Sequence, residues 1–282
     1  MQKLKNKVID RMMTMHLTKA EVDFILELAH YQDEKGRIRG VYYKKMCQAT
    51  GFSHETFYVT LESLADKGLI YVEKAAYGDF DITILDNDFT YKEAIKEGYV
   101  SVGKFEMFYD DNFKELKAGE KLLALQLLKI IGANQKYVIS VENFIAKYVQ
   151  LLQVTRRTIR GYIFKLSRFF NVTRKSNIFT FWVRKADSDC TINMPTDLDN
   201  LSQHLTDVAC RRNKVPFVRA QYIETKHLIK QYHFKLKADI SNVFLQAVKS
   251  SLEKINAAIP NKYKWTRELR PALIHKLMIQ KM

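Results

Sequence analysis

The sequence of 282 residues is poor in turn-forming residues, in cysteine and in long apolar runs. It contains 10 Gly and 4 Pro, too few for the repeated tight turns of a β-sandwich. Its 3 cysteines, Cys47, Cys190 and Cys210, are odd in number and widely spaced, which indicates neither a disulfide framework nor a zinc site. The longest stretches without Asp, Glu, Lys or Arg are nine residues, Met46–His54 and Ile240–Val248, and a spanning helix needs about 20 apolar residues. We therefore expect a mainly helical, cytoplasmic protein with no membrane partner.

The positive charge is concentrated in two thirds of the chain. The net charge of +15 divides into −2 over residues 1–100 (14 Lys and Arg against 16 Asp and Glu), +8 over 101–190 (16 against 8) and +9 over 191–282 (16 against 7). A basic surface of this kind favours a polyanionic partner, nucleic acid before a membrane. A surface that serves only solubility is the alternative.

The first third of the chain has the pattern of a helix, a helix–turn–helix and a hairpin. Thr18 and Glu21 have the spacing of a capping box, Ser53 stands where it can cap a further helix, and a Tyr77–Asp79 turn separates two runs of strand character. The pattern predicts helices over Thr18–Tyr31, Val41–Ala49 and Ser53–Lys67, then strands over Leu69–Glu73 and Phe80–Leu85.

The same pattern returns after a shift of 102 residues without a gap. Residue identity is low, but the hydrophobic class and the turn positions agree through three helices and a second hairpin, Asn171–Arg174 and Ile178–Val183, which is more than a chance match of one helix face. The matched pairs include Ser53 with Thr155, Phe57 with Ile159, Leu61 with Ile163, and Leu64 with Leu166.

Both copies resemble the winged helix–turn–helix superfamily, over about residues 12–86 and 117–184. The run Ala146–Arg160 looks like the family's support helix, turn and Ser/Thr-capped recognition helix, with Gln153 where the family usually has Gly. Two such units in one chain also resemble plasmid replication initiators. The resemblance implies a mainly α fold with small β-wings. Its expected parts are winged-helix domain 1 (1–90), a connector (91–116), winged-helix domain 2 (117–186) and a helical C-terminal domain (187–282).

The second recognition helix is the candidate DNA reader. If Ile159, Ile163 and Leu166 face the core, the arginines at its start point outward, toward base edges in a major groove. Arginine can grip guanine O6 and N7 together, Thr155 can cap the helix and offer its first amides to a phosphate, and Gly161 keeps the surface low. A solvated arginine face is the alternative. The predicted DNA-binding residues are Thr155, Arg156, Arg157, Arg160 and, on the wing, Arg174 and Lys175.

The first recognition helix has a different outward face. Glu55 and Glu62 would be repelled by phosphates, and an exposed Val59 can read only a thymine methyl. We therefore expect this copy to contact protein, or to bind DNA weakly through Lys44 and Lys45.

The remaining motifs give weaker indications. Asp239–Ala258 has the period of an amphipathic helix, and a preceding basic stripe, together with Arg211 and Arg212, either holds phosphates or is the wet side of a helix. The acidic residues near the first wing are expected to face solvent, and Gly98–Lys104 has the spacing but not the context of a phosphate loop. Cys210 beside two arginines is either inert or, with a lowered pKa, oxidation-sensitive. The stripe is Arg219, Lys226, Lys230, His233 and Lys237, and the acidic residues are Asp79, Asp81, Asp86 and Asp88.

These observations predict that the chain is a sequence-specific double-stranded DNA-binding protein. Its predicted role is that of a transcription regulator that reads the major groove with its second winged helix. The alternatives are a plasmid-type replication initiator that binds origin repeats, and a protein-interaction scaffold. We expect no catalytic site, no metal and no cofactor. Double-stranded DNA is the expected partner, with a homodimer through winged-helix domain 1 or the C-terminal helices.

Overall fold

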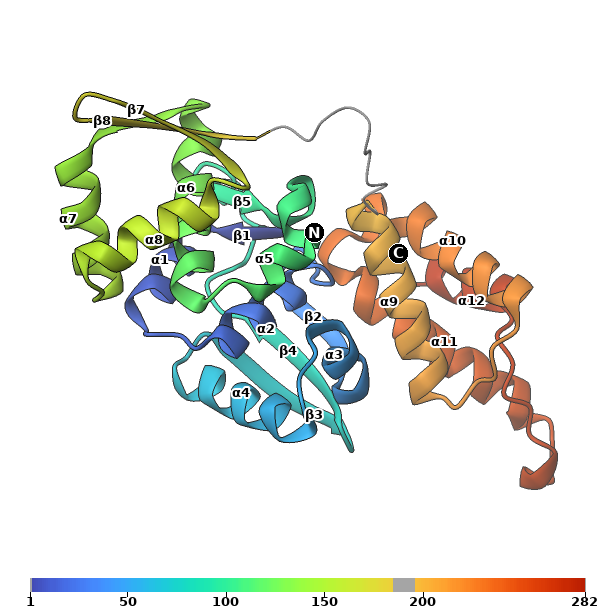
Figure 1. The fold of residues 1–282 in the computed structure, drawn as a ribbon. Coiled ribbons are helices and arrows are strands. Elements are labelled where there is room, and N and C mark those ends of the chain that lie inside the picture. The colour runs from blue at the N-terminus through green and yellow to red at the C-terminus, as the bar shows by residue number, and fades with distance from the viewer. Residues whose placement is uncertain (1, 185–195, 282) are drawn as a thin grey trace.

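The computed structural model describes residues 2–184 and 196–281. It is mainly helical and contains three small antiparallel sheets, so the predicted class of a mainly α fold with small β elements is confirmed. Figure 1 shows a larger body, which holds the first two thirds of the chain, and a helical unit beside it. Cys190 lies outside the described residues, as do the first nine residues of the predicted C-terminal domain (187–282).

The first unit, residues 19–84, forms a three-stranded sheet in the order β2-β4-β3 with three helices. Thr18 and Glu21 form the predicted capping box, with Glu21 N 3.2 Å from Thr18 Oγ1 and Thr18 N 2.6 Å from Glu21 Oε2. The elements are α2 (Lys19–Ala29), β2 (Arg37–Tyr42), α3 (Tyr43–Thr50), α4 (His54–Asp66), β3 (Ile70–Ala76) and β4 (Asp79–Ile84).

The second unit, residues 118–183, repeats this order. Its sheet runs β6-β8-β7, so in each unit the last strand lies in the middle and the strand between the first two helices is at one edge. The elements are α6 (Ala118–Asn134), β6 (Tyr137–Ser140), α7 (Val141–Leu152), α8 (Arg156–Leu166), β7 (Phe170–Lys175) and β8 (Ile178–Val183).

The edge strand β2 was not anticipated, because the predicted pattern has no strand between the helices Thr18–Tyr31 and Val41–Ala49. The register of β2 against β4 shifts between Ile38 and Val41, where Gly40 has a φ of 72°. This irregularity puts Ile38 and Val41, three positions apart, both in the core. A bulge of this kind removes the strict alternation by which a strand is recognised in sequence.

The segment predicted as a connector, 91–116, is packed against the N-terminus. Strand β5 (Tyr99–Ser101) pairs with β1 (Lys3–Lys5), and Val102 N donates to Gln2 O at 2.9 Å. A backbone amide of the G-x-x-x-x-G-K stretch is therefore already engaged. The other elements here are α1 (Asn6–Thr14), the short helix α5 (Asp111–Glu115) and the 3₁₀ turns η1 (Val102–Lys104) and η2 (Glu106–Tyr109).

Helix α6 joins the two units into one core. It contacts α1, α2 and α8. Its buried leucines are distributed around the whole helix, as expected of a helix that has no continuous polar face. One continuous hydrophobic cluster consequently runs from Leu4 to Phe181. The buried side chains of α6 include Leu122, Leu123, Leu125, Leu127 and Leu128.

The C-terminal unit, residues 196–281, has a separate hydrophobic core built from Leu205, Ile229, Phe244 and Ile274. Its third helix confirms the amphipathic period predicted for residues 239–258. The elements are α9 (Asp197–Arg212), α10 (Arg219–Leu236), η3 (Lys237–Asp239), α11 (Ile240–Ala257), η4 (Lys262–Lys264) and α12 (Pro271–Ile279).

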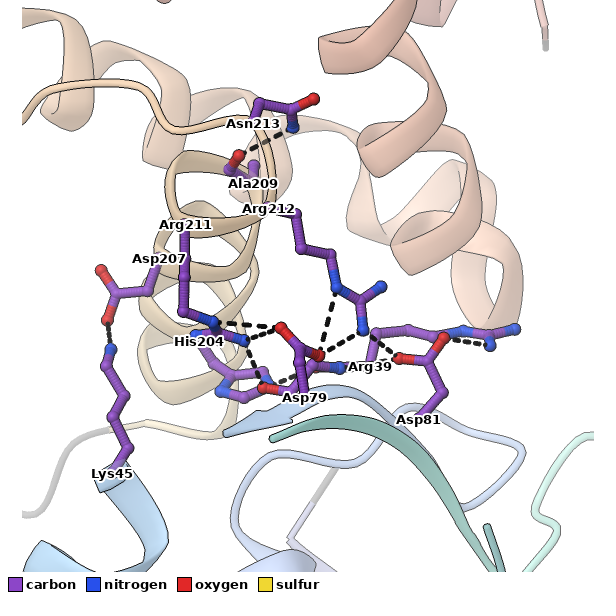
Figure 2. A network of polar contacts seen from close by, with 11 residues as sticks. Arg39, Lys45, Asp79, Asp81, His204, Asp207, Ala209, Arg211, Arg212 and Asn213 are labelled. Atoms are coloured by element: carbon purple, nitrogen blue, oxygen red, sulfur yellow. Dashed lines mark hydrogen bonds and ion pairs between the residues drawn. The ribbon is translucent and has the colours of Figure 1, made fainter. Parts of the chain in front are cut away.

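An ionic junction attaches α9 to the first unit, and it overturns the prediction that the acidic hairpin faces solvent (Figure 2). Asp79 is buried, and its carboxylate accepts hydrogen bonds from Arg211 (2.7 and 3.1 Å) and Arg212 (2.7 and 3.3 Å). Asp81 accepts from Arg212 at 2.6 Å and from Arg39 at 2.8 Å. Burial alone would raise the pKa of Asp81, but its hydrogen bonds and charge contacts, those to Arg212 foremost, lower it.

The other two acidic residues of that stretch are also engaged. Asp86 pairs with Lys7 at 2.6 Å and with Arg11 at 2.5 Å, and these contacts lower its pKa. Asp88 accepts from Thr90 N at 2.8 Å. The prediction of a solvent-facing carboxylate therefore holds for Asp86, which is exposed, and fails for Asp79, which is buried.

Close backbone packing accompanies the ion pairs of the junction. A Cβ on Gly40 would stand 2.4 Å from a methyl of Val208 on α9, so only glycine allows this approach. His204 of α9 stacks on Tyr31 at 4.9 Å between ring centroids, and its Nε2 lies 2.6 Å from Arg39 O. Burial lowers the pKa of His204 to about 4. At neutral pH the ring is therefore uncharged and donates Nε2–H to the carbonyl.

Neither alternative given for Arg211 and Arg212, phosphate binding or the wet side of a helix, is correct, because both guanidinium groups are bound to Asp79. Part of the basic stripe, which runs along α10 to Lys237, is engaged in contacts within the C-terminal unit. Lys230 forms an ion pair with Asp199, and Lys226 Nζ donates to Gln203 Oε1 at 3.4 Å. Two of the five stripe residues therefore hold α10 to α9.

Candidate nucleic-acid interface

The N-terminal end of α8 carries the three predicted arginines on its surface. Ile159 is fully buried and Leu166 is 1% exposed, and this fixes the rotation of the helix. Arg156, Arg157 and Arg160 are exposed. In the described part of the chain, none of the three forms an ion pair or a side-chain hydrogen bond, so their donors are available to a partner.

An equivalent N-terminal cap begins α8 in the second unit and α4 in the first unit. Thr155 Oγ1 accepts from Thr158 N at 3.2 Å, as Ser53 Oγ accepts from Thr56 N at 3.0 Å. The cap satisfies the Thr158 amide, and the amides of Arg156 and Arg157 before it have no intrahelical acceptor because they stand at the helix start. Together with the helix dipole, these amides favour an anion at this end.

The turn before α8 keeps its conformation although glycine is absent. Gln153 has φ 51° and ψ 45°, in the left-handed region, and its counterpart Gly51 has φ 75° and ψ 14°. Each residue's N–H bonds back to the helix it ends, to Val149 O and Cys47 O respectively. The departure from glycine therefore strains the turn without changing it.

Gly161 has no packing reason to be glycine. A Cβ there would meet nothing within 4 Å, and the residue is exposed on the second turn of α8. Its counterpart in the first unit is Val59, which is 59% exposed. The second unit is thus flatter at this position than the first.

The tip of the second hairpin is exposed and basic. Arg174 and Lys175 end β7 and are both exposed. Arg174 Nε donates to Ser176 O at 3.2 Å, which orients the guanidinium while leaving its terminal nitrogens free. All six predicted DNA-binding residues are accessible. They lie at two places of one unit, the start of α8 and the β7–β8 turn.

Phe164 is a surface residue that the sequence analysis missed. It is 81% exposed and lies one turn after Arg160 and two after Arg157, so the three share a face of α8. The available signal was its position out of phase with the core residues Ile159, Ile163 and Leu166. An exposed phenylalanine on an arginine face suits contact with a thymine methyl.

Charge distinguishes the two units strongly over equivalent segments. Residues 136–184 contain ten Lys and Arg against one Glu, a net charge of +9, whereas residues 34–82 contain seven against seven, a net charge of zero. Lys165 pairs with Glu120 at 2.9 Å and Arg168 with Asp110 at 3.9 Å, so acids just outside this segment compensate two of the cations. The excess charge remains mostly unpaired and accessible.

The first unit presents aromatic and acidic groups where the second presents arginines. The positions equivalent to Arg156, Arg157 and Arg160 are His54, Glu55 and Tyr58, and the His54 and Tyr58 rings lie 4.7 Å apart. Lys45, expected to give weak DNA contact, forms an ion pair with Asp207 of α9. Lys44 is exposed.

Three further features concern the Cys210 thiol, metal ligands and membrane-spanning helices. Burial raises the pKa of the Cys210 thiol to about 11, the opposite of a reactive thiolate. Within residues 2–184 and 196–281, no group of three or more His, Cys, Asp and Glu side chains could hold a metal ion. In the same residues, no helix combines the length and apolarity needed to span a bilayer.

Comparisons with family models, with curated proteins and with solved structures find no match to this chain.

Proposed function

We propose that this chain is a sequence-specific double-stranded DNA-binding protein composed of two winged-helix units and a helical C-terminal unit. The observation that carries the proposal is the set of three exposed arginines at the start of α8, without a partner in the described chain. The order helix, strand, helix, helix, hairpin, found twice with the same strand order, supports the winged-helix assignment.

In this proposal α8 enters the major groove with its N-terminal end. Arg157 and Arg160 face base edges, where a bidentate contact to guanine is worth about 1–3 kcal/mol of discrimination. Arg156 and the first amides of α8 hold a phosphate. Arg174 and Lys175 on the hairpin contact the backbone beside the groove. Phosphate contacts fix the register, and base contacts give specificity.

The test is duplex binding by fluorescence anisotropy across a salt series, with selected and random duplexes. Arg157→Ala should weaken binding to the selected duplex by about 5- to 150-fold and reduce the preference over random duplex. Arg156→Ala should weaken both equally and flatten the slope of log K against log salt by about 0.9. The control is Lys92→Ala, which removes an exposed cation that lies outside both recognition helices, both hairpins and the basic stripe and should leave binding unchanged.

A second pair of variants tests the approach of α8 rather than its charge. Gly161→Val introduces the side chain that the first unit carries at this position. Gly132→Val places the same group on α6, where a Cβ also meets nothing within 4 Å. Only the Gly161 variant should weaken duplex binding. If Gly161→Val and Gly132→Val bind duplex equally well, and Arg157→Ala keeps the selectivity of the unmodified chain, α8 is not the element that recognises DNA.

The biological role that we propose for this DNA binding is regulation of transcription. Replication initiation is the second candidate, supported by the presence of two like units that share one core. The positions of the binding sites separate them: an operator beside a promoter supports the regulator, and clustered repeats at an origin support the initiator. A scaffold that binds only proteins requires duplex binding to be absent or indifferent to sequence.

We also propose that the first unit contacts protein, as its surface residues suggest. Val59 on α4 and Tyr71 and Tyr77 on the hairpin are 56–79% exposed. A second copy of the chain is the simplest partner. Light scattering tests this, and a particle of 33.1 kDa at working concentration would exclude the dimer.

A further inference from the structure

The connection between α11 and α12 projects from the C-terminal unit as a separate arm, residues 258–270. In Figure 1 it is the orange-red segment that extends past the end of α11, away from the rest of the molecule. It contains one short 3₁₀ turn, η4, whose residues Lys262, Tyr263 and Lys264 are all exposed.

The arm is held in shape at its base. Asn256, which is 8% exposed, forms two hydrogen bonds with the backbone of Thr266, at 2.9 and 3.0 Å. Trp265 Nε1 donates to Ile259 O at 3.1 Å across the arm, and Leu269 is buried in the core of the C-terminal unit. These contacts fix both ends of the arm.

The tip of the arm carries aromatic rings among unpaired cations. Tyr263 is 99% exposed and Trp265 45% exposed. Among the described residues, the side chains of Lys262, Lys264, Arg267 and Arg270 form no ion pair. The one acid, Glu268, accepts from Gln221 at 2.5 Å. The arm therefore has a net charge of +3, from four basic residues and one acidic residue.

We propose that this arm binds single-stranded nucleic acid. A fully exposed tyrosine offers both faces of its ring for stacking, and unpaired bases have flat faces that stack on such a ring, each stack being worth about 1–3 kcal/mol. The lysines on either side of Tyr263 supply the charge that tracks the phosphates. Bases within a duplex are already stacked, so duplex DNA would leave Tyr263 unused. A membrane surface would need more buried apolar area than the arm provides, because beside the two rings it exposes only small apolar groups, Ala258 and Pro260, and part of Ile259.

The arm and α8 share no residues, so binding of single strands can be tested separately from recognition of duplex DNA by α8. We would titrate the full chain into a labelled oligothymidylate of about 15 nucleotides at low salt. Tyr263→Ala should raise the Kd by about 5- to 150-fold and leave duplex selectivity unchanged. In a Trp182→Phe background, the oligonucleotide should quench the fluorescence of Trp265, which lies beside the proposed stack.

The matched control is Phe234→Ala, which removes an aromatic ring that is 78% exposed on α10. It should bind oligothymidylate as the unmodified chain does. Tyr263→Ala should also fold normally, because Tyr263 is 99% exposed and buries no surface that the fold depends on. Equal Kd values for Tyr263→Ala and Phe234→Ala would overturn the proposal, as would an equal loss for duplex and single strand. Binding to vesicles that contain phosphatidylserine, lost in Tyr263→Ala while oligothymidylate binding persists, would reassign the arm to a membrane surface.

Discussion

Removal of the Asp79 charge is the most direct test of the junction between α9 and the first unit. The Asp79 side chain is 5% exposed and receives four hydrogen bonds from two guanidinium groups. Breaking a buried ion pair from one side costs about 3–5 kcal/mol. Arg211 and Arg212 retain 22% and 24% exposure, and Arg212 keeps Asp81. We therefore expect Asp79→Asn to cost about 2–3 kcal/mol.

The two tryptophans of the chain allow the loss to be located. Trp182 lies on β8 in the second unit, and Trp265 lies in the arm of the C-terminal unit. With Trp182→Phe or Trp265→Phe as the background, urea denaturation followed by fluorescence reports one core at a time. Asp79→Asn should lower the Trp265 midpoint by roughly 1–2 M urea. The Trp182 midpoint should move less, because the larger core does not depend on the junction.

A carboxylate in a similar pairing but at the surface provides the control. Asp86 also pairs with two cations, Lys7 and Arg11, but its side chain is 30% exposed. Asp86→Asn should cost less than about 1 kcal/mol. A double-mutant cycle between Asp79→Asn and Arg212→Met should give a coupling of about 1–3 kcal/mol. Equal costs for the Asp79 and Asp86 variants, or no coupling with Arg212, would refute the assignment of the junction as a buried ionic contact.

Three further predictions follow from local features. Gln153→Gly should stabilise the chain by about 1 kcal/mol, a rise of about 2–4 °C in Tm by calorimetry, because it relieves a left-handed conformation; Gly51→Ala, which introduces that strain, should have the opposite effect. Thr155→Ala removes the cap of α8 and should cost about 1 kcal/mol in urea denaturation. His204 takes up a proton near pH 6.5 in the unfolded chain but only near pH 4 in the folded chain. The contribution of His204 to the free energy of unfolding is therefore complete above pH 6.5, and it falls by up to about 3 kcal/mol as the pH is lowered toward 4. His204→Gln, which keeps a donor for Arg39 O, should lessen this acid dependence; an unchanged pH profile would contradict it.

Local signals in the sequence were read correctly where they determine structure by themselves. The capping pair Thr18 and Glu21, the helix over residues 239–258 and both hairpins are set by residues close together in the chain. The strand β2 was missed because its bulge at Gly40 disturbs the alternation on which strand prediction relies.

The junction could not be predicted from sequence because its partners lie far apart in the chain. Asp79 and Arg211 are 132 positions apart, so Asp79 looked like a solvated acid and Arg211 like a phosphate ligand. Each interpretation was reasonable for an isolated side chain, and each was wrong because the other residue neutralises it. The candidate site at α8 could be predicted, because the cap and the helical period depend only on residues close together in the chain. These two signals indicate which side chains of α8 are exposed. Phe164 is exposed against its hydrophobic class, so hydropathy alone does not place it on the arginine face.

The burial of α6 limits how this protein can be dissected. A fragment that begins at residue 117 would contain the whole of the candidate reader. It would also lose α1 and α2, which both contact α6, and so uncover apolar surface of that helix. Such a fragment should aggregate or unfold, and a negative DNA-binding result from it would say nothing about α8. The smallest excisable piece that retains an intact core spans residues 2–184, and experiments that truncate the chain should begin from that piece.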